Sequence, residues 1–418
     1  MLTYLIIIAV AALLSYISVK VEEKTENKKI IYLMKGIAIL FPAVIAGIRY
    51  NVGTDYAGVY EPLFEKIKNN EELTYVRTME IGYVLLNRLV VFFGGSFNIV
   101  MFISSLITMW AIYMGIEHYK NRISMPLAVM FFMIILYQKS FNLVRQLMAM
   151  AIVFYGFKFL DFKEDENKIE DEKYKQKYKE KGKDLTKYKP RYKHNKEYYK
   201  YIGFEYVKYI ICVLVAACFQ RTSLVMLAIP FIHNIYTNPR LRPLKIASYI
   251  ALLIIILNFG AIGKILEGIP SLKYYANYFK KIGGADISVA YYIRIIPAII
   301  PYLFLWKKIN EDKQMSLLFG LNIVGSILLL LGYLTDTYGE RLSLYFTIFQ
   351  IILFPFYIRC FKENKKLFIG SIVFFTVFNL AIWFYDYIYK RRDETIPYQT
   401  VFNKEEVDKI ESKRVINE

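Results

Sequence analysis

The chain begins with the uncharged run LTYLIIIAVAALLSYISV (residues 2–19). An apolar helix of this length matches the hydrocarbon core of a bilayer, which is about 30 Å thick. The run has neither the basic leader nor the small-residue cleavage site of a secretory signal peptide. We therefore interpret it as a first membrane-spanning helix.

Similar runs recur along the 418 residues, 56% of which are hydrophobic, and this composition does not fit an ordinary soluble domain. We predict about twelve spans, near residues 2–19, 30–48, 97–116, 124–138, 143–161, 205–219, 223–237, 245–263, 289–306, 315–334, 341–358 and 366–386. The expected fold is all-α: a polytopic transmembrane helical bundle in which residues 1–418 form one membrane domain. A soluble enzyme with a single membrane anchor is not expected.

The net charge of +18 comes from Lys and Arg residues that lie mainly in the short loops between the apolar runs. Loops that stay in the cytoplasm carry an excess of such residues, which is the positive-inside rule of membrane proteins. The positive charge therefore indicates which loops lie in the cytoplasm, and we expect no nucleic-acid partner.

The segment from Glu80 to Phe93 is apolar but short, and it carries Asn87 and Arg88. If it spanned the membrane, the Lys-rich stretches 20–29 and 163–200 would face opposite sides. We therefore predict an external interfacial helix, which removes this conflict. Both termini then lie outside the cell, together with the loop 49–96 and the polar tail 387–418, while the Lys-rich loop 162–204 is cytoplasmic.

Five arginines lie at the external ends of predicted spans, on the side where the positive-inside rule disfavours them: Arg49, Arg145, Arg221, Arg294 and Arg341. A guanidinium binds phosphate groups bidentately and stays charged in a partly dry site. A lipid-linked pyrophosphate would explain why several cations converge there. The alternative is that each arginine is an interfacial anchor or pairs with a nearby acid, as Arg341 would with Asp336 or Glu340.

An external reaction also needs a base, and the three histidines fall on or near the predicted cytoplasmic side. Among the external carboxylates, Asp55 follows Gly53 and Thr54 in a turn that would hold it near the membrane surface. It is our candidate general base. The alternative is that Thr54 and Asp55 cap a helix over residues 56–67. Tyr56 belongs to an external set of tyrosines that either form an interfacial belt or stack on sugar rings.

The segment AGIRYNVGTDY (residues 46–56) resembles the N-terminal signature of the EpsG family of exopolysaccharide-synthesis membrane proteins. Further similar segments follow in the family's order, namely EIGY (80–83), LVRQLMA (143–149), Arg341 with Tyr345-Phe346, and Pro397-Tyr398. The resemblance covers nearly the whole chain. It implies an architecture similar to O-antigen polymerases and ligases in the bacterial cytoplasmic membrane.

The resemblance also implies a Wzy-like polymerase that joins oligosaccharide repeat units carried on undecaprenyl pyrophosphate at the outer membrane face. We expect catalytic roles for Asp55, Arg145 and Arg341. We expect substrate contacts from Arg49, Tyr56, Gln146, Arg221 and Arg294, and neither a metal nor a cofactor. One departure is Gln220, which stands where many relatives carry a histidine. If that histidine is the catalytic base in the relatives, Asp55 or another acid would have to act here, or the substrate differs.

Three other functions remain open at this point. A flippase for the same lipid-linked unit would need polar residues at the membrane midplane, whereas the charges here lie toward one face. A ligase or acyltransferase of similar architecture would use an activated histidine or serine, and no external histidine is suitably placed. Other polysaccharide synthesis or export proteins are further candidate partners, and the chain itself could be a scaffold for them.

Overall fold

The computed structural model describes residues 1–71, 79–162, 196–237, 239–257, 289–335 and 337–404, together with 175–176, 179–180 and 268. The regular structure of these residues is helical, apart from an isolated bridge between Arg49 and Thr400. The all-α prediction is therefore confirmed for the described part of the chain. Its α-helices are α1 (Leu2–Lys24), α2 (Lys28–Gly47), α3 (Glu61–Lys68), α4 (Ile81–Phe92), α5 (Phe97–His118), α6 (Met125–Phe132), α7 (Val144–Gly156), α9 (Lys196–Ala217), α10 (Ile229–Thr237), α11 (Arg242–Leu257), α14 (Val289–Glu311), α15 (Lys313–Thr335), α16 (Thr337–Thr347), α17 (Gln350–Cys360) and α18 (Lys365–Phe384).

Short π-helical and 3₁₀ segments interrupt or extend several of these helices. The π-helical segments are η1 (Tyr56–Tyr60), η3 (Met133–Tyr137) and η10 (Tyr385–Tyr389). The 3₁₀ segments are η4 (Gln138–Phe141), η5 (Phe157–Leu160), η7 (Arg221–Ala228), η8 (Pro239–Leu241), η11 (Arg392–Glu394) and η12 (Val401–Asn403). They lie at the ends of the bundle and within predicted spans, so that some of these spans are not continuous α-helices.

The predicted number of about twelve spans is not confirmed. Among the described residues, four helices are long and apolar enough to cross a membrane: Leu2–Lys24, Lys28–Gly47, Phe97–His118 and Lys365–Tyr389. A fifth is counted if Gly339–Thr347 and Gln350–Cys360, which meet at 43°, form one broken span. Other predicted spans fall on helices that are shorter, broken or carry charged residues, and residues 258–263 lie outside the described part.

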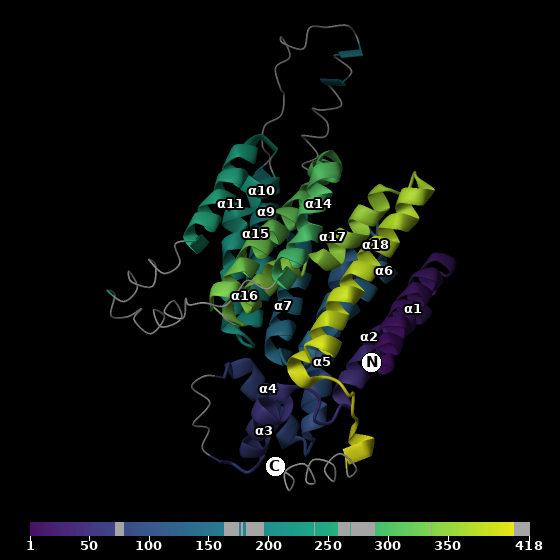
Figure 1. Ribbon diagram of the computed structural model, residues 1–418, viewed down its shortest axis with the longest axis vertical. Coiled ribbons are helices and arrows are strands. Elements are labelled where there is room, and N and C mark those ends of the chain that lie inside the picture. Colours follow the sequence, from purple (N-terminus) through teal and green to yellow (C-terminus); the bar gives the residue numbers. More distant parts are fainter. Residues whose placement is uncertain are drawn as a thin grey trace.

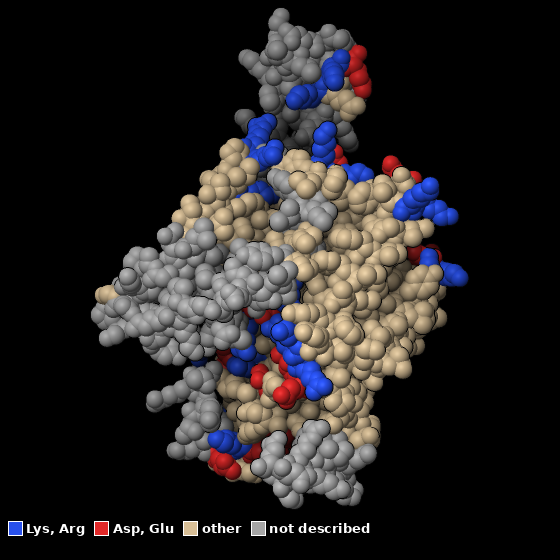
Figure 2. Space-filling view, in the orientation of Figure 1, with Lys and Arg blue, Asp and Glu red and all other residues tan. Residues whose placement is uncertain are grey.

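The long helices lie side by side and share one apolar core (Figure 1). α1 packs on α2 and α6, α5 packs on α2 and α7, and α15 packs on α14 and α16. Phe349, between α16 and α17, meets Phe157 at a ring-centroid distance of 4.4 Å and is completely buried. On the face seen in Figure 2, uncharged side chains cover the middle, and charged ones gather near the upper edge and in the lower half.

α3 and α4 form a small layer at the lower end of the bundle in Figure 1, over a second apolar cluster that includes Tyr60, Phe64 and Tyr83. α4 turns Tyr83, Val84, Asn87 and Val90 inward. Its outward face is apolar as well, because Ile81, Leu85, Leu89 and Phe92 are all exposed. An exposed apolar stripe of this kind is typical of a helix that contacts lipid, and its interfacial position stays a prediction.

The tail after α18 returns to the start of the chain. The Tyr4 hydroxyl donates to the Thr395 carbonyl at 2.6 Å, and the backbone N–H of Tyr50 donates to Gln399 at 3.0 Å. The start of α1 and the described tail therefore lie at one end of the bundle, together with residues 48–55, α3 and α4. We call this end the Asp55 end, and that it faces outward stays a prediction.

Close packing between α15 and α10 predicts that Gly320→Ala destabilises the protein. A Cβ atom at residue 320 would lie 2.1 Å from the ring of Tyr236, which is buried. Overpacking of this kind costs about 1–3 kcal/mol, so the thermal unfolding midpoint in detergent should fall by several degrees. The matched control is Gly36→Ala in α2, where a Cβ atom would have nothing within 4 Å. Equal midpoints for the two variants would contradict this packing.

Candidate functional site

The turn that carries Asp55 is fixed by the amide of Asn142. Gly53 has a φ of +98°, and a Cβ atom there would lie 2.3 Å from Asn142 Oδ1, so the position requires glycine. Asn142 Nδ2 donates to Thr54 Oγ1 at 2.9 Å, and Asn142 Oδ1 accepts from the Asp55 N–H at 3.4 Å. One side chain, from the short link between η4 and α7, thus holds both residues of the turn.

Asp55 is half-buried, and its carboxylate has no hydrogen bond or ion pair with any residue that the structure describes. The alternative role as a helix cap is not formed, because its side chain makes no hydrogen bond to the following π-helical turn. Burial raises the pKa of Asp55 above its ordinary value, and the nearby Asp393 adds to this effect while Arg341 and Arg145 oppose it. These are the properties of a carboxylate that can act as a base.

Glu80 connects two of the predicted arginines. Its side chain is 6–7% exposed and forms an ion pair with Arg145, from the first turn of α7. The other carboxylate oxygen accepts from the backbone N–H of Arg221 at 3.1 Å. The starts of α4, α7 and η7 therefore meet at one carboxylate.

Arg341 is brought to the same place by two contacts of α16. Gln146 Nε2 donates to the Arg341 carbonyl at 2.6 Å, and the Tyr345 hydroxyl lies 3.1 Å from Thr222 Oγ1, next to Arg221. The guanidinium groups of Arg341 and Arg221 are exposed and have no hydrogen bond or ion pair within the described part of the chain. Gln146 thus positions Arg341 through its backbone.

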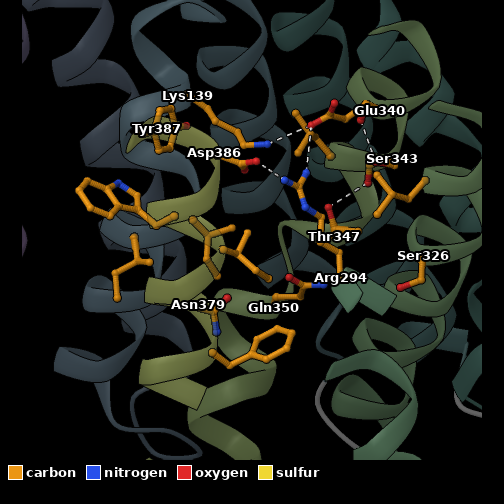
Figure 3. Close-up of a pocket in the computed structure, with 17 residues that line it drawn as sticks. Lys139, Arg294, Ser326, Glu340, Ser343, Thr347, Gln350, Asn379, Asp386 and Tyr387 are labelled. Carbon is orange, nitrogen blue, oxygen red and sulfur yellow. Dashed lines mark hydrogen bonds and ion pairs between the residues drawn. The ribbon is translucent and has the colours of Figure 1, made fainter. Parts of the chain in front are cut away.

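Arg294 lies in a neighbouring, buried cluster of charges centred on Glu340 (Figure 3). Glu340 is 5% exposed and binds Lys139 at 3.1 Å, Arg392, and Arg294 at a longer 3.8 Å. Arg294 also pairs with Asp386. The suggested pair of Arg341 with Glu340 is not observed, because the Glu340 carboxylate binds these other cations instead.

Arg49 and Tyr56 lie inside the protein rather than with the exposed cations. Arg49 is 2% exposed, donates to the carbonyls of Ala46 at 2.8 Å and Phe141 at 3.2 Å, and lies 4.5 Å from the centroid of the Phe141 ring. Tyr56 is 1% exposed and packs edge-on against Phe97. Both are buried and packed in this structure, and the substrate contacts expected from the sequence stay a prediction.

The sequence analysis missed several polar residues of this end, namely Lys139, Asn142, Asp386, Arg392 and Asp393. Asp386 carried a signal, because an acidic residue in the last turn of an apolar run is costly and marks a buried partner or a function. Arg392 and Asp393 carried none, since the tail has no hydrophobic periodicity. Their importance arises only from contacts between segments that are distant in the sequence.

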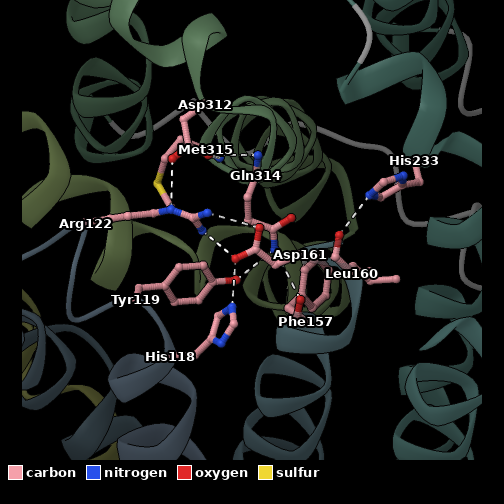
Figure 4. A network of polar contacts seen from close by, with 10 residues as sticks. All are labelled: His118, Tyr119, Arg122, Phe157, Leu160, Asp161, His233, Asp312, Gln314 and Met315. Carbon is pink, nitrogen blue, oxygen red and sulfur yellow. Dashed lines mark hydrogen bonds and ion pairs between the residues drawn. The ribbon is translucent and has the colours of Figure 1, made fainter. Parts of the chain in front are cut away.

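The opposite end of the bundle holds a separate polar network (Figure 4). Asp161 accepts from His118 at 2.8 Å and pairs with Arg122, which also binds Asp312 at 3.0 Å. His233 bonds to the Leu160 carbonyl at 3.1 Å, so neither described histidine is near Asp55, and His194 lies outside the described residues. No group of three or more His, Cys, Asp or Glu residues suited to a metal occurs in the described ranges.

Comparison with known proteins gives one family. The model of the EpsG family matches residues 32–169 and 198–400, which include the Asp55 turn, the starts of α7 and α16, and most of the described tail. No curated protein and no solved structure matches the chain. Because the family match covers most of the sequence, the chain belongs to the EpsG family of membrane proteins associated with exopolysaccharide synthesis.

Proposed function

We propose that this protein is a glycosyltransferase, a polymerase of cell-surface polysaccharide that works at the outer face of the bacterial cytoplasmic membrane. Family membership supports the pathway. The observation that carries the reaction is the gathering of Asp55, Arg221 and Arg341 at one end of the bundle with their charged groups unpaired among the described residues. The surrounding charges of Glu80, Arg145 and Glu340 are already paired.

In the proposed step, a hydroxyl of the acceptor repeat unit attacks the anomeric carbon of a glycan linked to undecaprenyl pyrophosphate. The new glycosidic C–O bond forms as the bond to the pyrophosphate oxygen breaks. The hydroxyl proton passes to the Asp55 carboxylate, and the leaving lipid pyrophosphate takes the bonding electron pair. Its added negative charge is stabilised by Arg341 and Arg221, because fixed cations are most effective where charge develops.

This assignment gives the remaining residues supporting roles. Arg145 keeps its ion pair with Glu80 and adds positive potential near Asp55. Gln146 and Asn142 fix the backbone positions of Arg341 and Asp55. Gln220, next to Arg221, has an amide side chain that cannot accept a proton near neutral pH, and this favours Asp55 as the base.

Loss of the proposed base, Asp55, or of the unpaired Arg341 guanidinium should stop polymer synthesis in the native host. We expect Asp55→Asn and Arg341→Ala each to lower polymer by about 100-fold or more, with single lipid-linked repeat units accumulating on the outer leaflet. The matched controls are Glu65→Gln on α3 and Arg88→Ala on α4, two exposed residues of the same end. All variants are compared with the wild type at equal protein level, and a deletion strain gives the result expected without the protein.

Other outcomes of this experiment identify the alternatives. Repeat units trapped on the inner leaflet would indicate a flippase. Normal polymer that fails to reach its final acceptor would indicate a ligase. Polymer at the wild-type level in both Asp55→Asn and Arg341→Ala would contradict the assigned site.

The raised pKa of Asp55 predicts the pH dependence of the reaction. A base works only when deprotonated, so activity in proteoliposomes should fall on the acidic side at a pH above the usual aspartate range. Asp393→Asn removes a neighbouring negative charge and should lower the pKa of Asp55. The acidic limb of the pH profile, where activity falls, should then move to lower pH. Asn tolerates the φ of +64° found at this position. A limb that stays in place or moves to higher pH would show that Asp55 is not the titrating base.

A further inference from the structure

An apolar groove of about 250 Å³ lies between α14, α17 and α18, in the half of the bundle away from the Asp55 end (Figure 1). Leu305, Phe361 and Phe375 belong to its wall. Phe304 and Leu367 also line it and are exposed, so the groove opens to the side of the bundle. A cavity of about 150 Å³ is enough to hold benzene. This groove therefore has room for a segment of a hydrocarbon chain.

The part of the groove formed by α18 is open because of Gly370. This residue lines the groove, and a Cβ atom there would have nothing within 4 Å. The hydroxyl of the next residue, Ser371, donates to the Phe368 carbonyl at 2.8 Å, so its one donor is used within the helix. A larger side chain at residue 370 would extend into open space without a clash.

One buried polar group in the wall has no partner. Tyr357 is 0% exposed, and its hydroxyl makes no hydrogen bond with any residue that the structure describes. Its ring packs against Phe375, at a centroid distance of 6.0 Å. An unpaired buried O–H group is costly. A ligand that brings an oxygen acceptor into the groove would remove this cost.

The end of the groove away from Asp55 is basic. Lys366 lies in the wall, is exposed and forms no ion pair within the described part of the chain. Lys308 donates to the Cys360 carbonyl at 2.7 Å, next to Phe361 in the wall, and this bond uses one of its three donors. The segments 307–311 and 359–366 together hold six basic and two acidic residues. An anion is therefore favoured at this end.

The polar groups decide which lipid fits. Hydrocarbon chains of the bilayer are as apolar as the groove wall, so the wall selects shape and the polar groups select the molecule. A phosphoglyceride carries a phosphate anion and, slightly deeper in the membrane, ester carbonyl oxygens. The basic residues and Tyr357 lie in the same order, because Tyr357 is one helical turn deeper than Phe361.

The polyprenyl chain of the proposed substrate fits these groups less well. It has no oxygen acceptor along its length for Tyr357. In the proposed reaction its pyrophosphate lies at the Asp55 end, far from Lys366 and Lys308. The positive-inside rule accounts for cations at this level of the membrane, but not for a groove and an unpaired hydroxyl directly beside them.

We infer that this groove binds one acyl chain of an anionic phospholipid, with the phosphate at Lys366 and Lys308 and an ester carbonyl that accepts from Tyr357. The lipid belongs to the leaflet opposite the Asp55 end, which the charge pattern predicts to be the cytoplasmic leaflet. The inference goes beyond the proposed function and does not depend on it, because the groove shares no residue with the proposed reaction site.

The test measures lipid binding to the purified full chain by native mass spectrometry. Dioleoyl phosphatidylglycerol is the anionic probe, and dioleoyl phosphatidylethanolamine, with the same chains, is the zwitterionic probe. The wild type should bind the anionic probe more tightly by about tenfold or more, and Lys366→Gln should reduce this preference by about fivefold. The matched control is Lys24→Gln, an exposed lysine at the end of α1, which should keep the preference.

Two further variants test the groove itself. Gly370→Leu fills the open space and should weaken binding of the anionic probe by about tenfold or more. Gly203→Leu on α9, where a Cβ atom also has nothing within 4 Å, should bind normally. Tyr357→Phe removes the unpaired donor, so it should not lower the unfolding midpoint of the lipid-free chain. It should reduce the rise in midpoint that phosphatidylglycerol causes, whereas a purely structural hydroxyl would lower the lipid-free midpoint.

Three results would overturn the inference. The first is equal affinity of the wild type for the two probes, and the second is wild-type affinity in Gly370→Leu. Undecaprenyl phosphate serves as a third probe for the other source of a hydrocarbon chain. If it displaces phosphatidylglycerol from the wild type and does not bind to Gly370→Leu, the groove belongs to the polyprenyl chain.

Discussion

The buried carboxylate of Glu340 binds cations from three separate parts of the chain: Lys139 after α6, Arg294 on α14, and Arg392 in the tail. A carboxylate that is 5% exposed costs several kcal/mol in lost hydration unless it is paired. Because these cations offset this cost together, the segments that carry them are held in one arrangement. That arrangement sets the first turn of α16, and with it the place of Arg341.

The charged residues of the Asp55 end divide into a paired scaffold and the unpaired groups to which the proposed reaction assigns catalytic roles. Glu340, Glu80 and Arg49 are buried and make several contacts, so they fix the backbone. Asp55, Arg221 and Arg341 have charged groups without partners in the described part of the structure. In the proposed reaction, the substrate completes the environment of these charged groups.

The helical fold, and the meeting of Asp55, Arg145, Arg221 and Arg341 at one end, could be predicted from the sequence. Long apolar runs predict membrane-spanning helices. Charged residues at the ends of these runs lie near the membrane surface, because burying them in the hydrocarbon core is costly. The number of spans could not be predicted, because breaks such as the 3₁₀ segment Arg221–Ala228 leave hydropathy unchanged. The surroundings of Arg49 could not be predicted either, because backbone carbonyls and the Phe141 ring that are distant in the sequence enclose it inside the protein. The roles of Arg392 and Asn142 depend on contacts across more than 50 residues, which no local pattern encodes.

The most direct test of the account is reconstitution of the purified chain in proteoliposomes with a labelled, lipid-pyrophosphate-linked repeat unit as the only substrate. Two products are measured together: glycan of increasing length and released lipid pyrophosphate. The account predicts that both appear in proportion, without any other protein, and that both are lost in the Asp55→Asn chain. Movement of the labelled unit across the bilayer with no longer glycan and no released lipid pyrophosphate would contradict it.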